Sequence, residues 1–254
     1  MRARRGYRRT VLCPIDGAWR RRSDKERFTV TPPPEDVGMD ADAALARYCS
    51  DHVGIASRRE LVALGFGPWW LDRRVAAGVL VPVQPGGYRH AAAPPTWLGS
   101  VRAAVLAAGD LAGASGPTAM RLYGARGTWA DEVELTVVGT AMPDLIDVHV
   151  RRIDRLEAGD VHRRFGVPVL APPLALLLLG AVEPAHRVEN AVHDLVFQRL
   201  TTRTKLLDAL TEYGGRGRRG TAALRRAVRS LPSSGATQTR LELDLLRLLR
   251  AHGL

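Results

Sequence analysis

The sequence predicts a mixed α+β fold built from regions of different character. Residues 53–90 carry helix-start and helix-stop signals, followed by a short ribbon of β-branched residues. Residues 97–180 alternate between Ala/Leu-rich helical segments and strands of period two, whereas residues 181–231 show helical spacing alone. We therefore expect a helical region with a β-ribbon at 41–91, a small mixed α+β module at 97–180 and C-terminal helices at 181–231.

Two short helices are predicted in the first region by their boundary residues. Ser57 and Glu60 have the spacing of a capping box, so a helix should begin directly after Ser57. Gly65 is suited to close that helix, because glycine adopts the left-handed conformation at little cost. Pro68 then occupies the first position of a second helix, which ends at Gly78.

A ribbon and a further helix complete this region. Residues 79–83 are apolar and mostly β-branched, Pro85-Gly86-Gly87 favours a turn, and residues 88–89 begin a return strand. Residues 41–51 are rich in alanine and leucine, with Asp40 or Asp42 available to cap a helix. Three helices followed by a ribbon are the outline of a winged helix-turn-helix, in which the helix from Pro68 would be the recognition helix.

Such a unit predicts a set of DNA contacts. Arginines of the two helices would contact phosphates or guanine edges, Trp69 or Trp70 would brace the recognition helix while the other joins the core, and the ribbon would reach an adjacent groove. Asp72 is unfavourable opposite phosphates, although it can accept a hydrogen bond from cytosine. The candidate DNA-contacting residues are Arg58, Arg59, Trp69, Arg73, Arg74, Tyr88 and Arg89.

The net charge of +11 is unevenly distributed. Residues 1–30 carry ten basic and three acidic side chains, and residues 151–254 carry eighteen and ten, whereas residues 41–90 carry only six and four. Almost all the cations are arginines, which a GC-rich coding bias explains as well as phosphate recognition does. The charge therefore belongs mainly to the two ends of the chain.

Residues 1–40 are expected to form a basic, disordered extension. They contain several arginine pairs and the run Pro32-Pro33-Pro34, without helical or strand periodicity. The extension would either steer DNA or be dispensable, as a segment added by an upstream start codon would be. The apolar stretch at residues 10–14 is too short for a secretory signal.

Composition and motifs favour a cytoplasmic protein without a cofactor. The longest apolar stretch, residues 167–182, is interrupted by prolines and is expected to enter a buried helix rather than cross a membrane. Cys13 and Cys49 have neither a disulfide framework nor metal-ligand spacing. The seven histidines are scattered, and phosphate-binding and nucleophile-elbow motifs are absent from the sequence, so we expect a protein that is not an enzyme.

Strands and helices are predicted through the remaining chain. Strands are expected at 133–138, 147–151 and 166–169, followed by a leucine-rich helix from Pro173. Further helices are expected at 188–199, 205–213 and 222–229. The glycine- and arginine-rich segment 214–220 is either a clamp for a nucleic-acid backbone or a solvated loop.

The first region has a characteristic order and spacing of short motifs: Ser57, Leu64-Gly65, Arg73-Arg74-Val75, Gly78-Val79-Leu80 and Gly87-Tyr88-Arg89. In this order and spacing it resembles the N-terminal domain of AbiEi-type antitoxins. The resemblance implies DNA binding, repression of the protein's own promoter, and opposition to a nucleotidyltransferase-like toxin without a stable complex.

The middle of the chain carries five short motifs in a fixed order, at residues 114–119, 122–124, 134–137, 149–152 and 166–169, followed by a leucine-rich helix. This order is similar to the middle region of an actinobacterial group, in which the module is followed by an endonuclease-like domain resembling very-short-patch repair nucleases. By that resemblance residues 232–254 are a linker and the first helix of such a domain, with Glu242 at the family's helix glutamate. A Thr-Ser-Pro-x-Arg-Thr-Leu phrase of the relatives is replaced here by residues 170–176. The sequence reaches Leu254 before the metal-binding carboxylates of the family, so we expect no nuclease activity.

Three functions follow as hypotheses. The first is a DNA-binding transcriptional regulator of the antitoxin class, with double-stranded DNA as partner and a cognate toxin opposed functionally. The second is a truncated remnant of a metal-dependent endonuclease-like protein. The third is a protein-interaction module without a DNA role, which is favoured if the recognition-helix arginines are buried or paired with Asp72 and Glu60.

Overall fold

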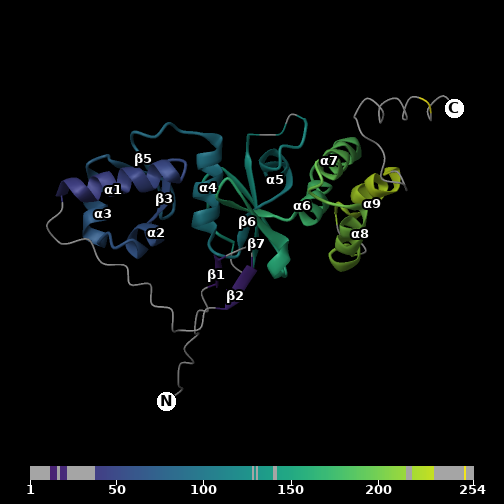
Figure 1. Cartoon of the computed structure of the whole chain (residues 1–254), viewed down its shortest axis with the longest axis horizontal. Coiled ribbons are helices and arrows are strands. Elements are labelled where there is room, and N and C mark those ends of the chain that lie inside the picture. Colours follow the sequence, from purple (N-terminus) through teal and green to yellow (C-terminus); the bar gives the residue numbers. More distant parts are fainter. Residues whose placement is uncertain are drawn as a thin grey trace, which may run out of the picture. The chain divides into compact units, whose positions relative to one another are not determined.

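The computed structural model describes residues 12–15, 18–21, 38–127, 129, 131–139, 142–215, 219–231 and 249. The described chain has a mixed α+β fold, as the sequence predicts (Figure 1). It divides into two compact units, the first comprising Met1–Ala114 with Asp131–Pro168 and the second Ser115–Ala130 with Val169–Leu254. The linker and helix expected at 232–254 lie outside the described residues, apart from Leu249.

Two strands occur within the N-terminal extension, where the sequence analysis expects no regular structure. Strands β1 (Leu12–Ile15) and β2 (Ala18–Arg21) form an antiparallel pair. The sequence between them is Asp16-Gly17, a dipeptide that favours two-residue hairpin turns. The prediction of a wholly irregular arm is therefore wrong at these eight residues, and the local turn signal explains why.

The 41–91 region contains three helices and a three-stranded antiparallel sheet of order β3-β5-β4. The capping box is confirmed, because the Glu60 backbone N–H donates to Ser57 Oγ at 3.1 Å and the Ser57 N–H donates to Glu60 Oε2 at 2.9 Å. Gly65 has the predicted positive φ, at +93°. The elements are α1 (Gly38–Asp51), β3 (Ile55–Ser57), α2 (Arg58–Ala63), α3 (Pro68–Ala76), β4 (Leu80–Gln84) and β5 (Gly87–His90).

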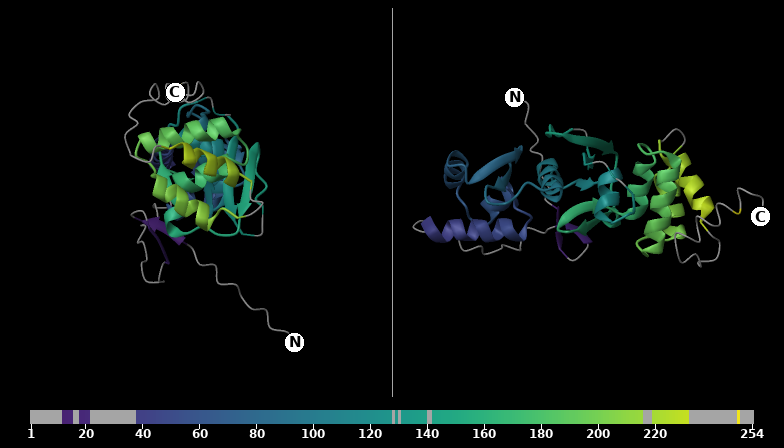
Figure 2. Two further views of the ribbon diagram at one scale, coloured as in Figure 1. Left: turned by 90° about the vertical axis from the view of Figure 1, so that its right-hand side faces the viewer. Right: turned by 90° about the horizontal axis from the view of Figure 1, so that it is seen from above.

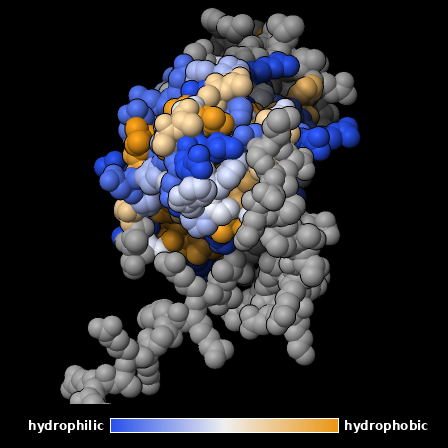
Figure 3. Space-filling model, turned by 90° about the vertical axis from the view of Figure 1, so that its left-hand side faces the viewer, coloured by the Kyte–Doolittle hydropathy of each residue, from blue (hydrophilic) through white to orange (hydrophobic). Residues whose placement is uncertain are grey.

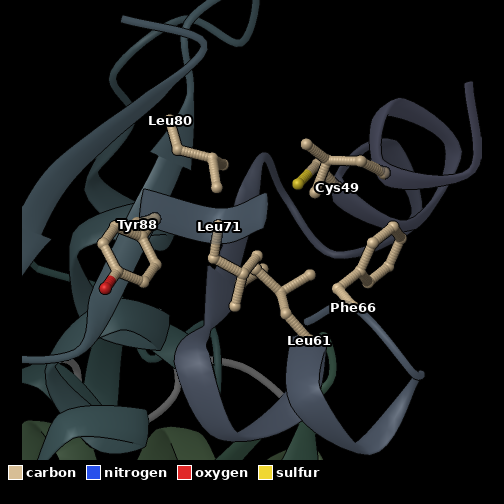
Figure 4. Close-up of a cluster of buried hydrophobic side chains, with 8 residues drawn as sticks. Cys49, Leu61, Phe66, Leu71, Leu80 and Tyr88 are labelled. Atoms are coloured by element: carbon tan, nitrogen blue, oxygen red, sulfur yellow. The ribbon is translucent and has the colours of Figure 1, made fainter. Parts of the chain in front are cut away.

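A cluster of buried side chains holds these elements together. Figure 4 shows Leu61 of α2 and Leu71 of α3 meeting at its centre, both fully buried. The burial of each such leucine stabilises the fold by roughly 2 kcal/mol relative to an exposed position. Members of the cluster come from every helix of the region and from all three strands: Leu45, Cys49, Ala56, Leu61, Phe66, Leu71, Leu80 and Tyr88.

Helix α4 (Trp97–Ala108) connects this region to the rest of the first unit. It contacts β3, β4 and β5 on the one hand and β6 and β7 on the other. The larger sheet has the strand order β8-β7-β6-β10-β9, with β7 antiparallel to β6 and parallel to β8. Its strands are β6 (Ala112–Ala114), β7 (Val133–Val138), β8 (Val148–Ile153), β9 (Val161–Arg164) and β10 (Val167–Leu170), and a 3-10 turn covers Ala158–Asp160.

The second unit is helical, and its helices pack into a small bundle (Figure 2). Helix α6 is almost entirely buried, so the apolar stretch 167–182 is divided between β10 and a core helix. Among the described residues, none of the helices combines the length and apolar character that a membrane crossing requires. The helices are α5 (Gly116–Leu122), α6 (Pro172–Leu179), α7 (Ala185–Phe197), α8 (Arg203–Glu212) and α9 (Thr221–Ser230).

Two glycines allow the end of α6 to meet the start of α9. A Cβ atom added to Gly220 would lie 2.1 Å from the Leu177 carbonyl oxygen, and one added to Gly180 would lie 2.7 Å from the Gly220 carbonyl oxygen. Gly220 also has a φ of +94°, which side-chain-bearing residues rarely adopt. The two helices therefore touch backbone to backbone.

This contact predicts a large effect of a single methyl group. Gly220→Ala should lower the free energy of unfolding by more than ~1 kcal/mol, since the new Cβ collides with backbone and the φ is strained. Gly215→Ala is the matched control, because nothing lies within 4 Å of its Cβ position. Urea unfolding of both variants measures the difference, and equal stabilities would contradict the contact.

Candidate nucleic-acid interface

Helix α3 presents one side to the core and another to solvent. Leu71 is fully buried in the cluster, whereas Trp69, Asp72, Arg73 and Ala76 form an exposed stripe at helical spacing. Trp69 is 69% exposed, which is unusual for so large an apolar side chain. Small apolar areas lie among hydrophilic ones on the face of the molecule drawn in Figure 3.

The two tryptophans of α3 have different surroundings, as the sequence analysis expects. Trp70 is half-buried, packs against the core cluster and stacks on Phe66 with 4.8 Å between ring centroids. Trp69 points to solvent and carries the Arg73 guanidinium 4.7 Å above its ring. Cation–π contact therefore holds Arg73 against the exposed aromatic surface.

Arg58 and Asp72 form an ion pair between α2 and α3. Arg58 Nη1 donates to Asp72 Oδ1 at 2.7 Å, and the same nitrogen lies 3.4 Å from the Tyr88 hydroxyl. The hydrogen bond to Asp72 raises the pKa of Arg58, and Arg58 in turn holds the pKa of Asp72 below its usual range. Asp72 thus neutralises a predicted DNA-binding arginine of the same chain.

Two more candidate arginines are paired with carboxylates. Both Asp110 oxygens accept hydrogen bonds from Arg59 Nη1 at 2.8 Å. Arg74 donates to both Asp42 oxygens, at 2.6 and 2.7 Å, and lies over the Trp70 ring. Arg74 is the less exposed of the two, so it fastens α3 to α1 while Arg59 remains near the surface.

Tyr88 and Arg89 of the ribbon make contacts within the fold. Tyr88 is only 9% exposed and belongs to the core cluster. Arg89 donates to the carbonyl oxygens of His90 and Ala93, in the loop that follows β5. Both residues, expected as DNA contacts, thus have partners within the chain, and their order in the sequence gave no sign of this.

The turn of the ribbon is likewise held in place. The buried side chain of Gln84 donates to the Ile146 carbonyl oxygen at 2.8 Å and accepts from the Ile146 N–H at 3.0 Å. The Arg58 N–H donates to the Gly86 carbonyl oxygen at 2.7 Å. The ribbon is thus attached to the loop before β8 and to the start of α2.

An ion pair between a buried arginine and a part-exposed carboxylate attaches α4 to the start of α2. Arg102, 5% exposed, donates through Nη2 to Glu60 Oε1 at 2.8 Å and through Nε to the Ile55 carbonyl oxygen at 3.4 Å. Arg102 is not among the residues predicted from the sequence to have a role. The available signal was its place as the lone charged residue of an Ala/Val-rich helix.

Burial changes the ionisation of two groups beside this pair. Desolvation raises the pKa of the Cys49 thiol to about 11 and raises that of Tyr48 as well. Cys49 is a free, buried thiol that stays protonated at neutral pH. In the described part of the chain no group of three His, Cys, Asp or Glu side chains is placed to hold a metal ion.

Comparisons with known proteins give little beyond this geometry. No family model matches the chain. No curated protein matches it either. Among solved structures, the crystal structure of RV2827C protein from Mycobacterium tuberculosis is similar, with 18% sequence identity, 78% of each chain covered and a TM-score of 0.49. Nothing about function follows from a likeness at this level.

Two of the ion pairs made by α2, Glu60–Arg102 and Arg58–Asp72, are expected to contribute unequally to stability. Glu60→Ala should lower the free energy of unfolding by about 3 kcal/mol, because it removes the helix cap and leaves Arg102 buried without its carboxylate. Asp72→Ala should change stability little, because its pair with Arg58 is exposed to water. Chemical unfolding of both variants tests this, with Glu60→Gln, which can retain the cap, expected between them. Equal losses for the two alanine variants would argue against Arg102 as the anchor.

Proposed function

We propose that residues 41–91 form a winged helix-turn-helix that binds double-stranded DNA, with α3 as the recognition helix. The observation that carries this proposal is the division of α3 into a side anchored by Leu71 and an exposed stripe that includes Trp69 and Arg73. Three helices and a small antiparallel sheet in this order support it. An exposed helix on a fixed support is what insertion into a major groove requires.

Arg73 is the central contact of the proposed interface. Within the described residues it has no carboxylate partner, in contrast to Arg58, Arg59 and Arg74. Stacking on Trp69 restricts the guanidinium while leaving its N–H groups able to donate to guanine or phosphate oxygens. Arg73 is therefore assigned to base or phosphate recognition and Trp69 to bracing it.

The three arginines paired with carboxylates differ in how readily they could bind DNA. Arg58 and Arg59 are 38% and 58% exposed, and surface ion pairs contribute at most about 1 kcal/mol. A DNA phosphate can therefore take the place of either carboxylate at modest cost. Arg74 is more buried and bonded through two oxygens of Asp42, so we assign it to the fold.

The resemblance to AbiEi-type antitoxins extends the proposal. It makes the bound DNA the protein's own promoter, and the biological effect opposition to a nucleotidyltransferase-like toxin in the cytoplasm. Of the linker and endonuclease-like helix expected at 232–254, only Leu249 lies among the described residues, so the remnant hypothesis stays a prediction.

A protein-interaction module is the second candidate function. Two observations favour it: the ion pairs that neutralise Arg58, Arg59 and Arg74, and the exposed apolar side chains of Val62, Leu64 and Trp69. Such a surface would bind a partner with weak salt dependence, because little charge is neutralised on contact. DNA binding has the opposite signature, since it releases counterions.

A gel-shift assay of the full chain on its own upstream DNA tests the proposal. Arg73→Ala should weaken binding about tenfold, the cost of losing one good base or phosphate contact. Arg47→Ala is the matched control, because it removes the same charge from an exposed position on α1. If wild type and Arg73→Ala bind alike as salt is raised, α3 is not the recognition helix. If neither binds DNA, the protein-interaction function is favoured.

Asp72→Asn gives an independent prediction. It should free Arg58 from its partner and remove a negative charge from the exposed stripe, so binding to DNA of any sequence should tighten several-fold and depend more steeply on salt. Binding titrations at several salt concentrations measure both effects. A loss of affinity confined to the preferred sequence would instead mean that Asp72 itself contacts a base.

A further inference from the structure

Helix α9 of the second unit has one buried and one basic side. Leu224, Ala227 and Val228 are buried against the other helices of the unit. Arg225, Arg226 and Arg229 are all exposed, and their positions fall within roughly 100° of arc around the helix. Helix α9 contains no acidic residue, and Arg219 lies exposed just before its start.

These four arginines lack partners within the described residues. Neither a hydrogen bond nor an ion pair joins Arg219, Arg225, Arg226 or Arg229 to another described side chain. The contrast is with the first unit, where Arg58, Arg59, Arg74 and Arg102 each meet a carboxylate. Like charges one turn apart on a helix repel each other, so an external anion would stabilise this surface.

We propose that the exposed face of α9, together with Arg219, binds the phosphate backbone of a nucleic acid without reading its sequence. Arginine donates in a planar fork that matches phosphate oxygens. Cations at successive helical positions suit an anion that repeats at short intervals, as the phosphates of a nucleic-acid strand do. The proposed site includes no residue of α3, so it can be tested independently of the proposed winged helix-turn-helix.

The apolar side of α9 argues against a membrane surface as the partner. An interfacial helix binds lipid by burying a free apolar face, and here that face is already packed against α7 and α8. The exposed side offers only Ala222 beside the arginines, without an aromatic or leucine side chain to insert. A hydrated, multiply charged backbone is the better match.

The helix is also well fixed for this role. His193 Nε2 of α7 lies 3.2 Å from the Ser230 hydroxyl at its end, and an Arg203 guanidinium N–H donates to the Leu231 carbonyl oxygen at 3.3 Å. The Gly180 and Gly220 contact fixes its start. Substitution of the exposed arginines should therefore leave the fold intact.

The test uses the full chain and fluorescently labelled DNA duplexes of random sequence. The triple variant Arg225→Gln, Arg226→Gln, Arg229→Gln should bind about tenfold more weakly at low salt, and the slope of log K against log salt should fall by two to three. The control Arg126→Gln, Arg199→Gln, Lys205→Gln removes three charges from other exposed positions of the same unit. It should bind nearly as wild type does, and circular dichroism melts should show that both variants fold.

Equal binding by the triple variant and the control overturns the proposal. So does arginine-dependent binding to vesicles of phosphatidylserine without binding to the duplexes, which would make a membrane the partner. Arg73→Ala separates this site from α3: it should affect the upstream DNA and leave the random duplexes bound through α9. Failure at one site is therefore distinguishable from failure at the other.

Discussion

The Glu60 carboxylate makes two connections on which the first unit depends. Its Oε2 oxygen accepts hydrogen bonds from the Ser57 N–H and hydroxyl at the start of α2, and its Oε1 oxygen accepts from Arg102 of α4. Helix α4 contacts strands of the three-stranded sheet and of the five-stranded sheet, so the Glu60 side chain links α2 to the helix that joins these two sheets. Because Leu61 of α2 packs on Leu71, the direction of α3 follows from the same connection. A charge pair so little exposed to water contributes orientation more than net stability.

Ion pairs within the chain compensate part of the positive charge that underlies its net charge of +11. In the 41–91 region three of the six arginines, Arg58, Arg59 and Arg74, have a carboxylate partner within the chain, so the surface seen by a partner is less basic than the composition suggests. Arg73 and the α9 arginines differ, because aromatic stacking or solvent takes the place of a carboxylate. Potential at a surface depends on which charges are compensated locally, and only the three-dimensional arrangement shows that.

Local signals made much of the fold predictable. The capping box at Ser57, Pro68 at the start of α3 and the alternation at Val133–Val138 all lie where the structure has the corresponding element. Strand β3 was missed, since three buried residues show no alternation. The candidate site was predicted less well, because the partners of its arginines, such as Asp110, are distant in sequence and only tertiary structure brings them together.

The contact between α6 and α9 at Gly180 and Gly220 affects how the exposed, arginine-bearing face of α9 can evolve. Main-chain atoms and the Ala223 methyl group form that contact, so the position of α9 is nearly independent of the side chains on its outer face. Those outer residues can change in charge and size while the helix keeps its place. The glycine contact therefore fixes where the outer face of α9 lies, while the side chains on that face determine what it binds. Substitutions there can create or remove a ligand site without changing the fold.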